Sequence, residues 1–172
     1  MAVRRANPVV AVVVGTVLII GGYFALKYGQ KSIDLAKASV EWPSVPGKVE
    51  RSEVVRSRDS DGDTMYRAEI IYRYAVNGEA LESDQRRIGA TTSSSSSKGA
   101  YKVTRAYPEG KDVTVYYNPA APEEAVLEPG VFLESKILWY VGIIFMVLGL
   151  LLAGWPLVKL VLIGGLLAVK RT

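Results

Sequence analysis

The stretch TMYRAEIIYRYAVNG, residues Thr64–Gly78, decides the fold of this chain. Apolar and aromatic residues occupy every second position, namely Tyr66, Ala68, Ile70, Tyr72, Tyr74 and Val76. Charged residues stand between them, at Arg67, Glu69 and Arg73. This alternation is typical of a strand with one buried and one solvated face. The dipeptide Asn77-Gly78 then predicts a type I′ hairpin turn, because that turn needs a positive φ at both central residues.

A hairpin closed by Asn77-Gly78 also predicts which residues face each other. The expected pairs are Arg73 with Glu82, Glu69 with Arg86, and Tyr74 with Leu81. Two pairs of opposite charge and one apolar pair are favourable across antiparallel strands. We expect Tyr72 and Tyr74, together with Tyr117, to fill a core; an aromatic ligand cleft is the alternative for these three tyrosines.

The residues around this hairpin predict a small α+β domain. Further strands are expected at 47–58, 112–117 and 125–127, and a helix at 98–106. Val113, Val115 and Tyr117 share one face of the fourth strand, and the helix should place Tyr101, Val103 or Ala106 on the sheet. The serine-rich run 91–97 is either a linker whose last serine caps the helix or a flexible, modified loop. The order β-β-β-α-β-β predicts a mainly antiparallel sheet or partly open barrel with one helix.

The segment RDSDGDT, residues 58–64, permits two interpretations. Its three aspartates, Asp59, Asp61 and Asp63, begin like a calcium loop. However, counting from Asp59 places Ile70 where a calcium loop of the helix–loop–helix type needs a bidentate glutamate, and strands rather than helices flank the segment. We therefore favour the turn of a first hairpin with Gly62 at a positive φ, and an irregular calcium site as the alternative.

Two uncharged segments, residues 8–26 and 137–158, are long enough for helices that cross a bilayer. The cations beyond them are Arg4, Arg5, Lys159, Lys170 and Arg171. By the positive-inside rule both termini are expected in the cytoplasm and the middle domain outside it. The fold class is thus a membrane α-helical hairpin that encloses the β-rich domain. A cleaved signal peptide is the alternative for the first segment.

Five regions follow from these patterns. They are a tail and first membrane helix (1–28), a juxtamembrane helix and linker (29–46), the β-rich domain (47–136), a second membrane helix (137–158) and a cytoplasmic tail (159–172). Trp155-Pro156 should bend the chain, after which residues 160–169 either lie at the interface or extend the helix at an angle. Ten residues are too few to span the bilayer again.

Small residues lie along both apolar segments, at Ala11, Gly15 and Gly22 in the first and at Gly149 and Ala153 in the second. Small residues allow close approach of membrane helices. We expect them to pack the two helices of one chain together; homodimerisation through the same residues is the alternative.

Charge and composition weigh against two classes of protein. All 17 acidic residues lie between Lys27 and Lys136 with 16 of the 21 basic ones, so the net charge of +4 reflects membrane topology and not a nucleic-acid-binding face. The chain has no histidine and no cysteine, the commonest general base and the thiolate ligand. We expect no enzymatic activity, metal or cofactor. A hydrolase using Ser93–Ser97 with Lys98 or Lys102 would need a buried lysine.

Several motifs fall in an order that resembles the DUF3592 family, domains of unknown function in bacterial membrane proteins with flanking helices. They are Trp42, Gly47-Lys48-Val49, Ile71–Gly78, Tyr107-Pro108-Glu109-Gly110, Val113–Pro119 and Ala125–Gly130. The resemblance covers residues 40–130 and implies no reaction or ligand. We therefore expect a non-enzymatic binding or scaffold module whose β-domain contacts another envelope protein or a lipid. An accessory subunit of a transporter or channel is the alternative.

Overall fold

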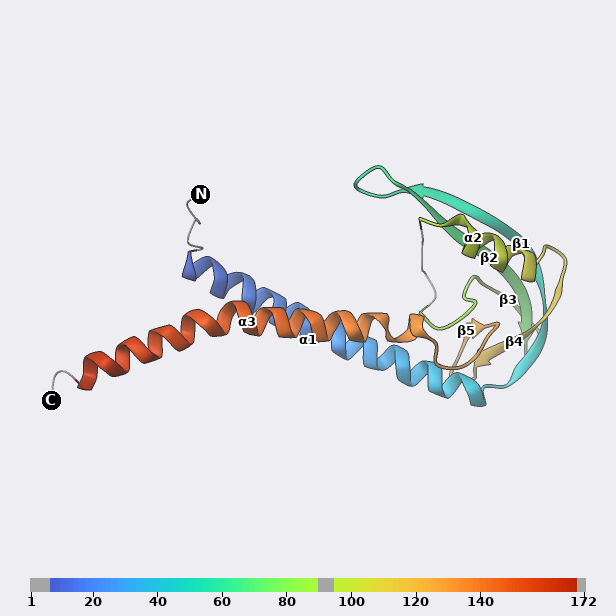
Figure 1. Cartoon of the computed structure of the whole chain (residues 1–172). Helices are drawn as coiled ribbons and strands as arrows, with labels where there is room; N and C mark the ends of the chain where they lie inside the picture. Colours follow the sequence, from blue (N-terminus) through green and yellow to red (C-terminus); the bar gives the residue numbers. More distant parts are fainter. Residues whose placement is uncertain (1–6, 90–94, 170–172) are drawn as a thin grey trace. The chain divides into compact units, whose positions relative to one another are not determined.

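The computed structural model describes residues 7–89 and 95–169, apart from the side chains of Leu157 and residues 160–169. The elements in chain order are α1 (Pro8–Ala38), the 3-10 turn η1 (Ser39–Glu41), β1 (Ser44–Arg58), β2 (Thr64–Val76), β3 (Glu79–Ser83), α2 (Ser97–Ala106), β4 (Asp112–Asn118), β5 (Ala121–Val126) and α3 (Leu133–Val169) (Figure 1). The chain forms two compact units, residues 1–31 with 137–172 and residues 32–136. The predicted order β-β-β-α-β-β is confirmed.

The second unit contains a five-stranded antiparallel sheet with the order β3-β2-β1-β4-β5. The helix α2 packs against β2 and β1 (Figure 1). The two edge strands β3 and β5 also contact each other, although they are not neighbours in the sheet. Ser83 Oγ of β3 donates to Ala125 O of β5 at 3.3 Å and so connects the two edges, and Tyr72 Oη of β2 lies 2.8 Å from the same oxygen. The sheet is therefore curled into a partly open barrel. Its two edge strands are joined through side chains and not through a ladder of backbone hydrogen bonds.

The core lies inside this curled sheet. Its buried members are Val49, Ile70, Tyr72, Tyr74, Val76, Val115, Ala125 and Leu127. The alternation read from the sequence is confirmed, because the buried residues of β2 are four of the six predicted ones, and Tyr117 packs against them. Of the residues expected to place α2 on the sheet, Val103 does so, whereas Tyr101 and Ala106 are exposed.

The second hairpin closes as the sequence predicts. Asn77 has a φ of 52° and Gly78 one of 86°, as a type I′ turn requires. Arg73 faces Glu82 and Tyr74 faces Leu81. The third expected pair is wrong: β3 ends at Ser83, so Glu69 faces Glu53 of β1 and Arg86 lies beyond the ladder. The pairing stops because the chain has to leave the strand toward the start of α3.

The first hairpin uses its aspartates to build the turn. Asp59 Oδ1 accepts hydrogen bonds from the amides of Asp61 at 3.0 Å and Asp63 at 2.9 Å, and Gly62 has a φ of 88°. This is the side-chain-to-backbone bonding that favours Asp in turns. Among the residues that the structure describes, there is no group of three or more potential metal-ligating side chains. The turn interpretation is confirmed.

Both apolar helices are longer than expected. The juxtamembrane helix predicted within 29–46 is not a separate element, because α1 continues without a break to Ala38 and is followed by η1. The strand β1 begins at Ser44, three residues earlier than predicted. Helix α3 continues through Pro156 to Val169, so residues 160–169 extend the helix. Proline removes one backbone donor from a helix, but here the helix does not end at it.

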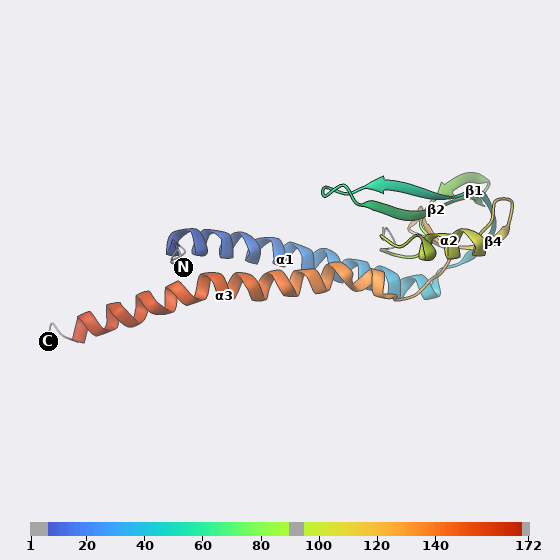
Figure 2. The ribbon, with the colours of Figure 1, turned by 45° about the horizontal axis from the view of Figure 1, so that its top comes forward.

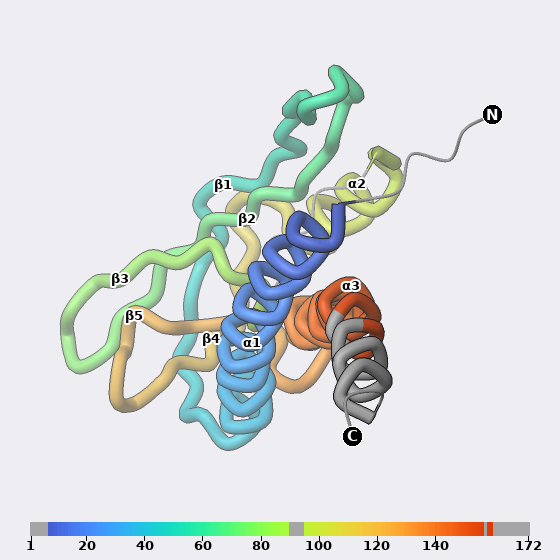
Figure 3. The backbone as a smooth tube through the Cα atoms, turned by 90° about the vertical axis from the view of Figure 1, so that its left-hand side faces the viewer, coloured from blue at the N-terminus to red at the C-terminus, as the bar shows by residue number. Residues whose placement is uncertain are grey.

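Within the first unit, α1 and α3 lie side by side along a seam of small residues (Figures 2 and 3). A Cβ added to Gly15 would lie 2.8 Å from Ala153 Cβ, and one added to Gly22 would lie 2.9 Å from Gly142 O. A Cβ added to Gly149 would lie 2.6 Å from Gly15 O. The small residues therefore pack the two helices of one chain together, as the sequence analysis favours; homodimerisation through them stays a prediction.

Candidate functional site

Two arginines and two glutamates gather where three segments of the second unit meet. Arg86 and Arg87 follow β3, Glu128 follows β5, and Glu134 lies in the first turn of α3. We call these four residues the Arg–Glu cluster. All four side chains are between 18% and 26% exposed, so the ion pairs are only partly screened by water.

The four side chains bind one another in a closed arrangement. Arg86 Nη1 donates to Glu128 Oε1 at 3.0 Å, and Arg87 Nε donates to Glu128 Oε2 at 2.6 Å. Arg87 Nη1 also donates to Glu134 Oε1 at 3.3 Å, whereas Arg86 Nη2 lies 3.9 Å from the same oxygen. Hydrogen bonds between such charged groups are about twice as strong as neutral ones. The cluster therefore fixes the start of α3 to the strand ends.

Two aromatic side chains complete the cluster. The Arg87 guanidinium lies over the ring of Phe132, 3.9 Å from its centre, in a cation–π contact. Tyr107 Oη donates to Glu128 Oε1 at 2.8 Å. Burial alone would raise the pKa of Glu128, but the hydrogen bonds from Tyr107, Arg86 and Arg87 together lower that pKa below its usual value. Burial, followed by the bond to Glu128, raises the pKa of Tyr107 to about 12.

Backbone groups fasten the same region. The amides of Leu127 and Glu128 donate to Arg86 O at 3.1 and 2.9 Å, and Ser135 Oγ donates to Ile88 O at 2.9 Å. Ser39, fully buried in η1, accepts a hydrogen bond on Oγ from the amide of Gly130 at 2.9 Å. Consequently η1 is hydrogen-bonded to the segment after β5, and the first turn of α3 is hydrogen-bonded to the segment after β3.

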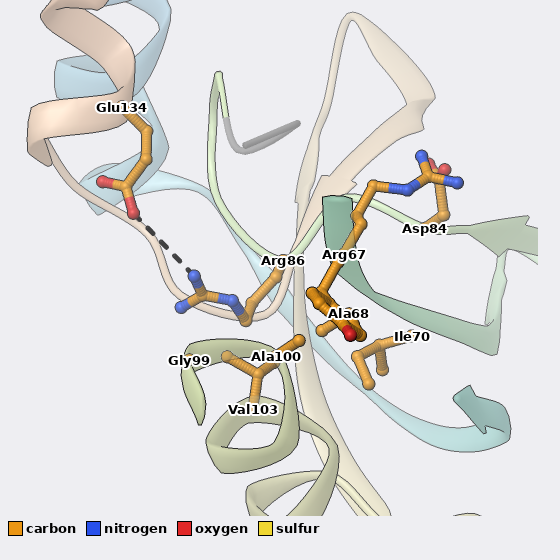
Figure 4. A pocket seen from close by; sticks show the side chains of 10 residues that line it. Arg67, Ala68, Ile70, Asp84, Arg86, Gly99, Ala100, Val103 and Glu134 are labelled. Carbon is orange, nitrogen blue, oxygen red and sulfur yellow. Dashed lines mark ion pairs between the residues drawn. The ribbon is translucent and has the colours of Figure 1, made fainter. Parts of the chain in front are cut away.

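A pocket of about 140 Å³ adjoins the cluster, between α2 and β2 (Figure 4). Four apolar residues form part of its wall, namely Ala68, Ile70, Ala100 and Val103. Charged groups of both signs complete it. Arg86 and Glu134 of the cluster lie on one side, and Arg67 and Asp84 lie on the other (Figure 4). The Arg–Glu cluster therefore contributes one cation and one anion to the wall of this pocket.

The structure describes only some of the residues proposed for a serine hydrolase, namely Ser95–Ser97, Lys98 and Lys102. Ser93 and Ser94 lie outside the described residues, and Lys98 and Lys102 are exposed on α2. The buried lysine that this chemistry needs is therefore not provided by either of them. The tyrosines weighed as a ligand cleft serve the core. Tyr72 Oη lies 2.8 Å from both Gln85 O and Ala125 O, so its single proton is shared between two carbonyl acceptors, and Tyr74 Oη donates to Pro122 O at 2.8 Å.

Sequence reasoning missed the Arg–Glu cluster. It assigned Arg86 to a strand pair and gave no role to Arg87, Glu128 or Glu134. The only local signal is the adjacent pair of arginines, which begins three residues after the end of β3. Two solvated arginines would fit that pattern equally well. The partners stand more than 40 residues further along the chain, so only the fold brings them together.

These features define a small α+β domain that is flanked in the sequence by two long apolar helices. The chain belongs to the DUF3592 family: a family model described as a domain of unknown function matches residues 45–132, just over half of the chain. The resemblance seen in the motifs is thereby confirmed. No curated protein matches the chain.

Proposed function

We propose that this chain is a two-span protein of a bacterial inner membrane, with both termini in the cytoplasm and the sheet domain outside it. In this proposal the domain is a non-enzymatic binding module that meets another envelope protein. The observation that carries the membrane part is the apolar surface of the two helices. The observation that carries the binding part is a two-stranded arm of the sheet whose outer edges have no neighbouring strand among the described residues.

The helix surfaces match lipid rather than water. Two helical stretches, Pro8–Glu41 and Leu133–Pro156, are long and apolar enough to span, with mean hydropathies of 2.5 and 2.4. Only 11% and 17% of their most apolar windows are buried. Burying a large apolar side chain is worth about 1.5–3 kcal/mol, so leaving this many of them in water would be very costly. The glycine seam agrees, because membrane helices associate through small residues.

The arm, which we define as residues 51–71, supports a binding role. Its two strands pair with each other, from Arg51 with Ile71 to Arg58 with Thr64. The neighbouring strands stop short of it: β4 pairs with β1 only over Ser44–Lys48, and β3 pairs with β2 only over Tyr72–Val76. Among the described residues, both outer edges of the arm therefore have no strand beside them. Such edges recruit strands from partner proteins.

The membrane part is tested with single cysteines, since the chain has none of its own. Ser60→Cys places a thiol in the exposed turn of the arm, and Ala2→Cys places one near the N-terminus. A membrane-impermeant maleimide should label Ser60→Cys in spheroplasts and label Ala2→Cys only after the membrane is opened. Labelling of both thiols, or the reverse pattern, would contradict the proposed topology.

The binding part is tested by shortening the arm. Val54 and Ala68 face each other, so residues 55–67 can be replaced by Asn-Gly, the turn already used after Val76. Tagged chains are cross-linked in cells and purified. A partner recovered with the full arm and lost with the short arm supports the proposal. A partner recovered equally with both is bound elsewhere, as an accessory subunit held through its helices would be.

A further inference from the structure

The pocket between α2 and β2 is lined by charged side chains whose hydrogen-bonding groups are not all bonded to other described residues. Arg86 Nη1 binds Glu128, but Arg86 Nη2 lies 3.9 Å from Glu134, beyond hydrogen-bond distance. Arg86 Nη2 therefore forms an ion pair with Glu134 but no hydrogen bond to it, and both side chains line the pocket. Asp84 makes no hydrogen bond or ion pair with any residue that the structure describes. Each side of the pocket thus carries one cation and one anion, Arg86 with Glu134 on one side and Arg67 with the exposed Asp84 on the other (Figure 4).

Gly99, in the first turn of α2, keeps the wall of this pocket open. A Cβ at this position would meet nothing within 4 Å, and the φ of Gly99 is not positive. Neither packing nor backbone conformation therefore requires glycine here. Glycine in a helix costs about 0.5–1 kcal/mol relative to alanine. Gly99 is exposed and lines the pocket together with Ala100 and Val103, and a Cβ added to it would extend into open space.

Size and charge together select a class of ligand. A pocket of about 140 Å³ is smaller than the roughly 300–1,000 Å³ of sites for drug-sized ligands, so nucleotides and sugars of that size do not fit. The charges lining it, Arg67 and Arg86 against Asp84 and Glu134, balance to zero. A simple anion or cation would meet as much repulsion as attraction. A small molecule with one charge of each sign would be complementary to both sides.

We infer that this pocket binds a small zwitterion, a free α-amino acid with a short side chain. Its carboxylate accepts hydrogen bonds from Arg86, and its ammonium group donates to Asp84 or Glu134. Its side chain lies against the apolar part of the wall, which Ala68, Ile70 and Val103 provide. This site goes beyond the proposed binding module, although Tyr66, Arg67, Ala68 and Ile70 of its wall belong to the base of the arm.

The test measures binding to the full-length chain in detergent micelles, by saturation-transfer NMR and calorimetry. The probes are L-alanine, which carries both charges, and acetate and methylamine, which carry one each. We expect alanine to bind at least about tenfold more tightly than either single-charge probe, because each of those leaves one charged contact unmade. Gly99→Leu should abolish alanine binding. Lys102→Leu, which adds the same side chain to an exposed position of α2 outside the pocket, should leave it unchanged.

Three results would overturn the inference. They are no binding of alanine up to about 10 mM, equal binding of acetate and alanine, and equal binding of alanine to the wild type and Gly99→Leu. Should Gly99→Leu not fold, Gly99→Ala serves in its place, since alanine favours the helix and still fills part of the space. It is expected to raise the melting temperature and weaken alanine binding together. Unchanged binding to a folded Gly99→Ala chain would also count against the site.

Discussion

Tyr107 donates its phenolic hydrogen bond to Glu128 over 2.8 Å, to the carboxylate that Arg86 and Arg87 also bind. The acceptor follows β5 and the donor follows α2, so one carboxylate gathers groups from separate parts of the domain. Their pKa values move in opposite directions, that of Glu128 downward and that of Tyr107 upward. The domain should therefore lose stability at both ends of the pH range.

Glu128 determines part of the acid limit. Because its pKa is lower in the folded chain than the usual 4.5, its contribution to stability is complete above that value and is lost as pH falls through the lowered pKa. Glu128→Gln should be less stable than the wild type at pH 7 and should lose less stability below pH 4.5. The measurement is denaturant unfolding followed by Trp42 fluorescence, with Trp139 and Trp155 replaced by phenylalanine. An equal loss of the free energy of unfolding below pH 4.5 in the wild type and in Glu128→Gln would refute this role.

Tyr107 determines part of the alkaline limit. Its pKa of about 12 exceeds the unfolded value of 10.0, so its contribution is complete below pH 10 and is lost as pH rises toward 12. Tyr107→Phe removes the hydrogen bond and should lower the free energy of unfolding at pH 7 by about 1.5–3 kcal/mol, the range for a bond to a charged group. The same fluorescence titration should show a shallower decline above pH 10. A variant as stable as the wild type at pH 7 would show that the bond contributes nothing.

The glycine seam can be tested with two adjacent positions. A Cβ at Gly22 would lie 2.9 Å from Gly142 O, whereas one at Gly21 would meet only Phe145 Cδ2 at 3.9 Å. Gly22→Val should separate α1 from α3, and Gly21→Val should not. Spin labels at the exposed Val17 and Leu150 report this as a longer, broader distance distribution in micelles.

The same labels test for a homodimer. A chain labelled only at Val17 should show no dipolar coupling if the seam joins helices of one molecule. Strong coupling from that single label, relieved by Gly22→Val, would instead assign the seam to an interface between copies.

Asp59 should stabilise the first hairpin without any metal. Its carboxylate accepts two amide hydrogen bonds, whereas that of Asp61 accepts no backbone bond within the turn. Asp59→Ala should cost about 0.5–2 kcal/mol, the range for a lost side-chain cap, and Asp61→Ala should stay within about 0.5 kcal/mol of the wild type. Melting temperatures in calcium and in a chelator should be equal. A calcium-dependent rise abolished by Asp61→Ala would restore the metal interpretation.

Short-range patterns alone were sufficient for much of this fold. The alternation in residues 64–76, the turn at Asn77-Gly78 and the two apolar segments all report on neighbours within a few residues of one another. Local chemistry settles such features: a type I′ turn needs positive φ, and a strand with one buried face needs alternation. The register of the second hairpin followed as far as Ser83 for the same reason. It was wrong for Glu69 and Arg86, because no local signal marks where β3 leaves the sheet.

Only the tertiary structure decided where charges and close contacts meet. Arg86 and Glu128 are 42 positions apart, and Gly15 contacts Ala153 across almost the whole chain. The sequence shows that these residues are charged or small, but a charge after a strand is compatible with solvent as well as with an ion pair. Sequence alone determined two apolar helices around a small antiparallel domain. The tertiary structure decided the Arg–Glu cluster, the pocket beside it and the residues that each glycine between α1 and α3 packs against. Contacts between distant segments depend on how the sheet curls and how the helices pack.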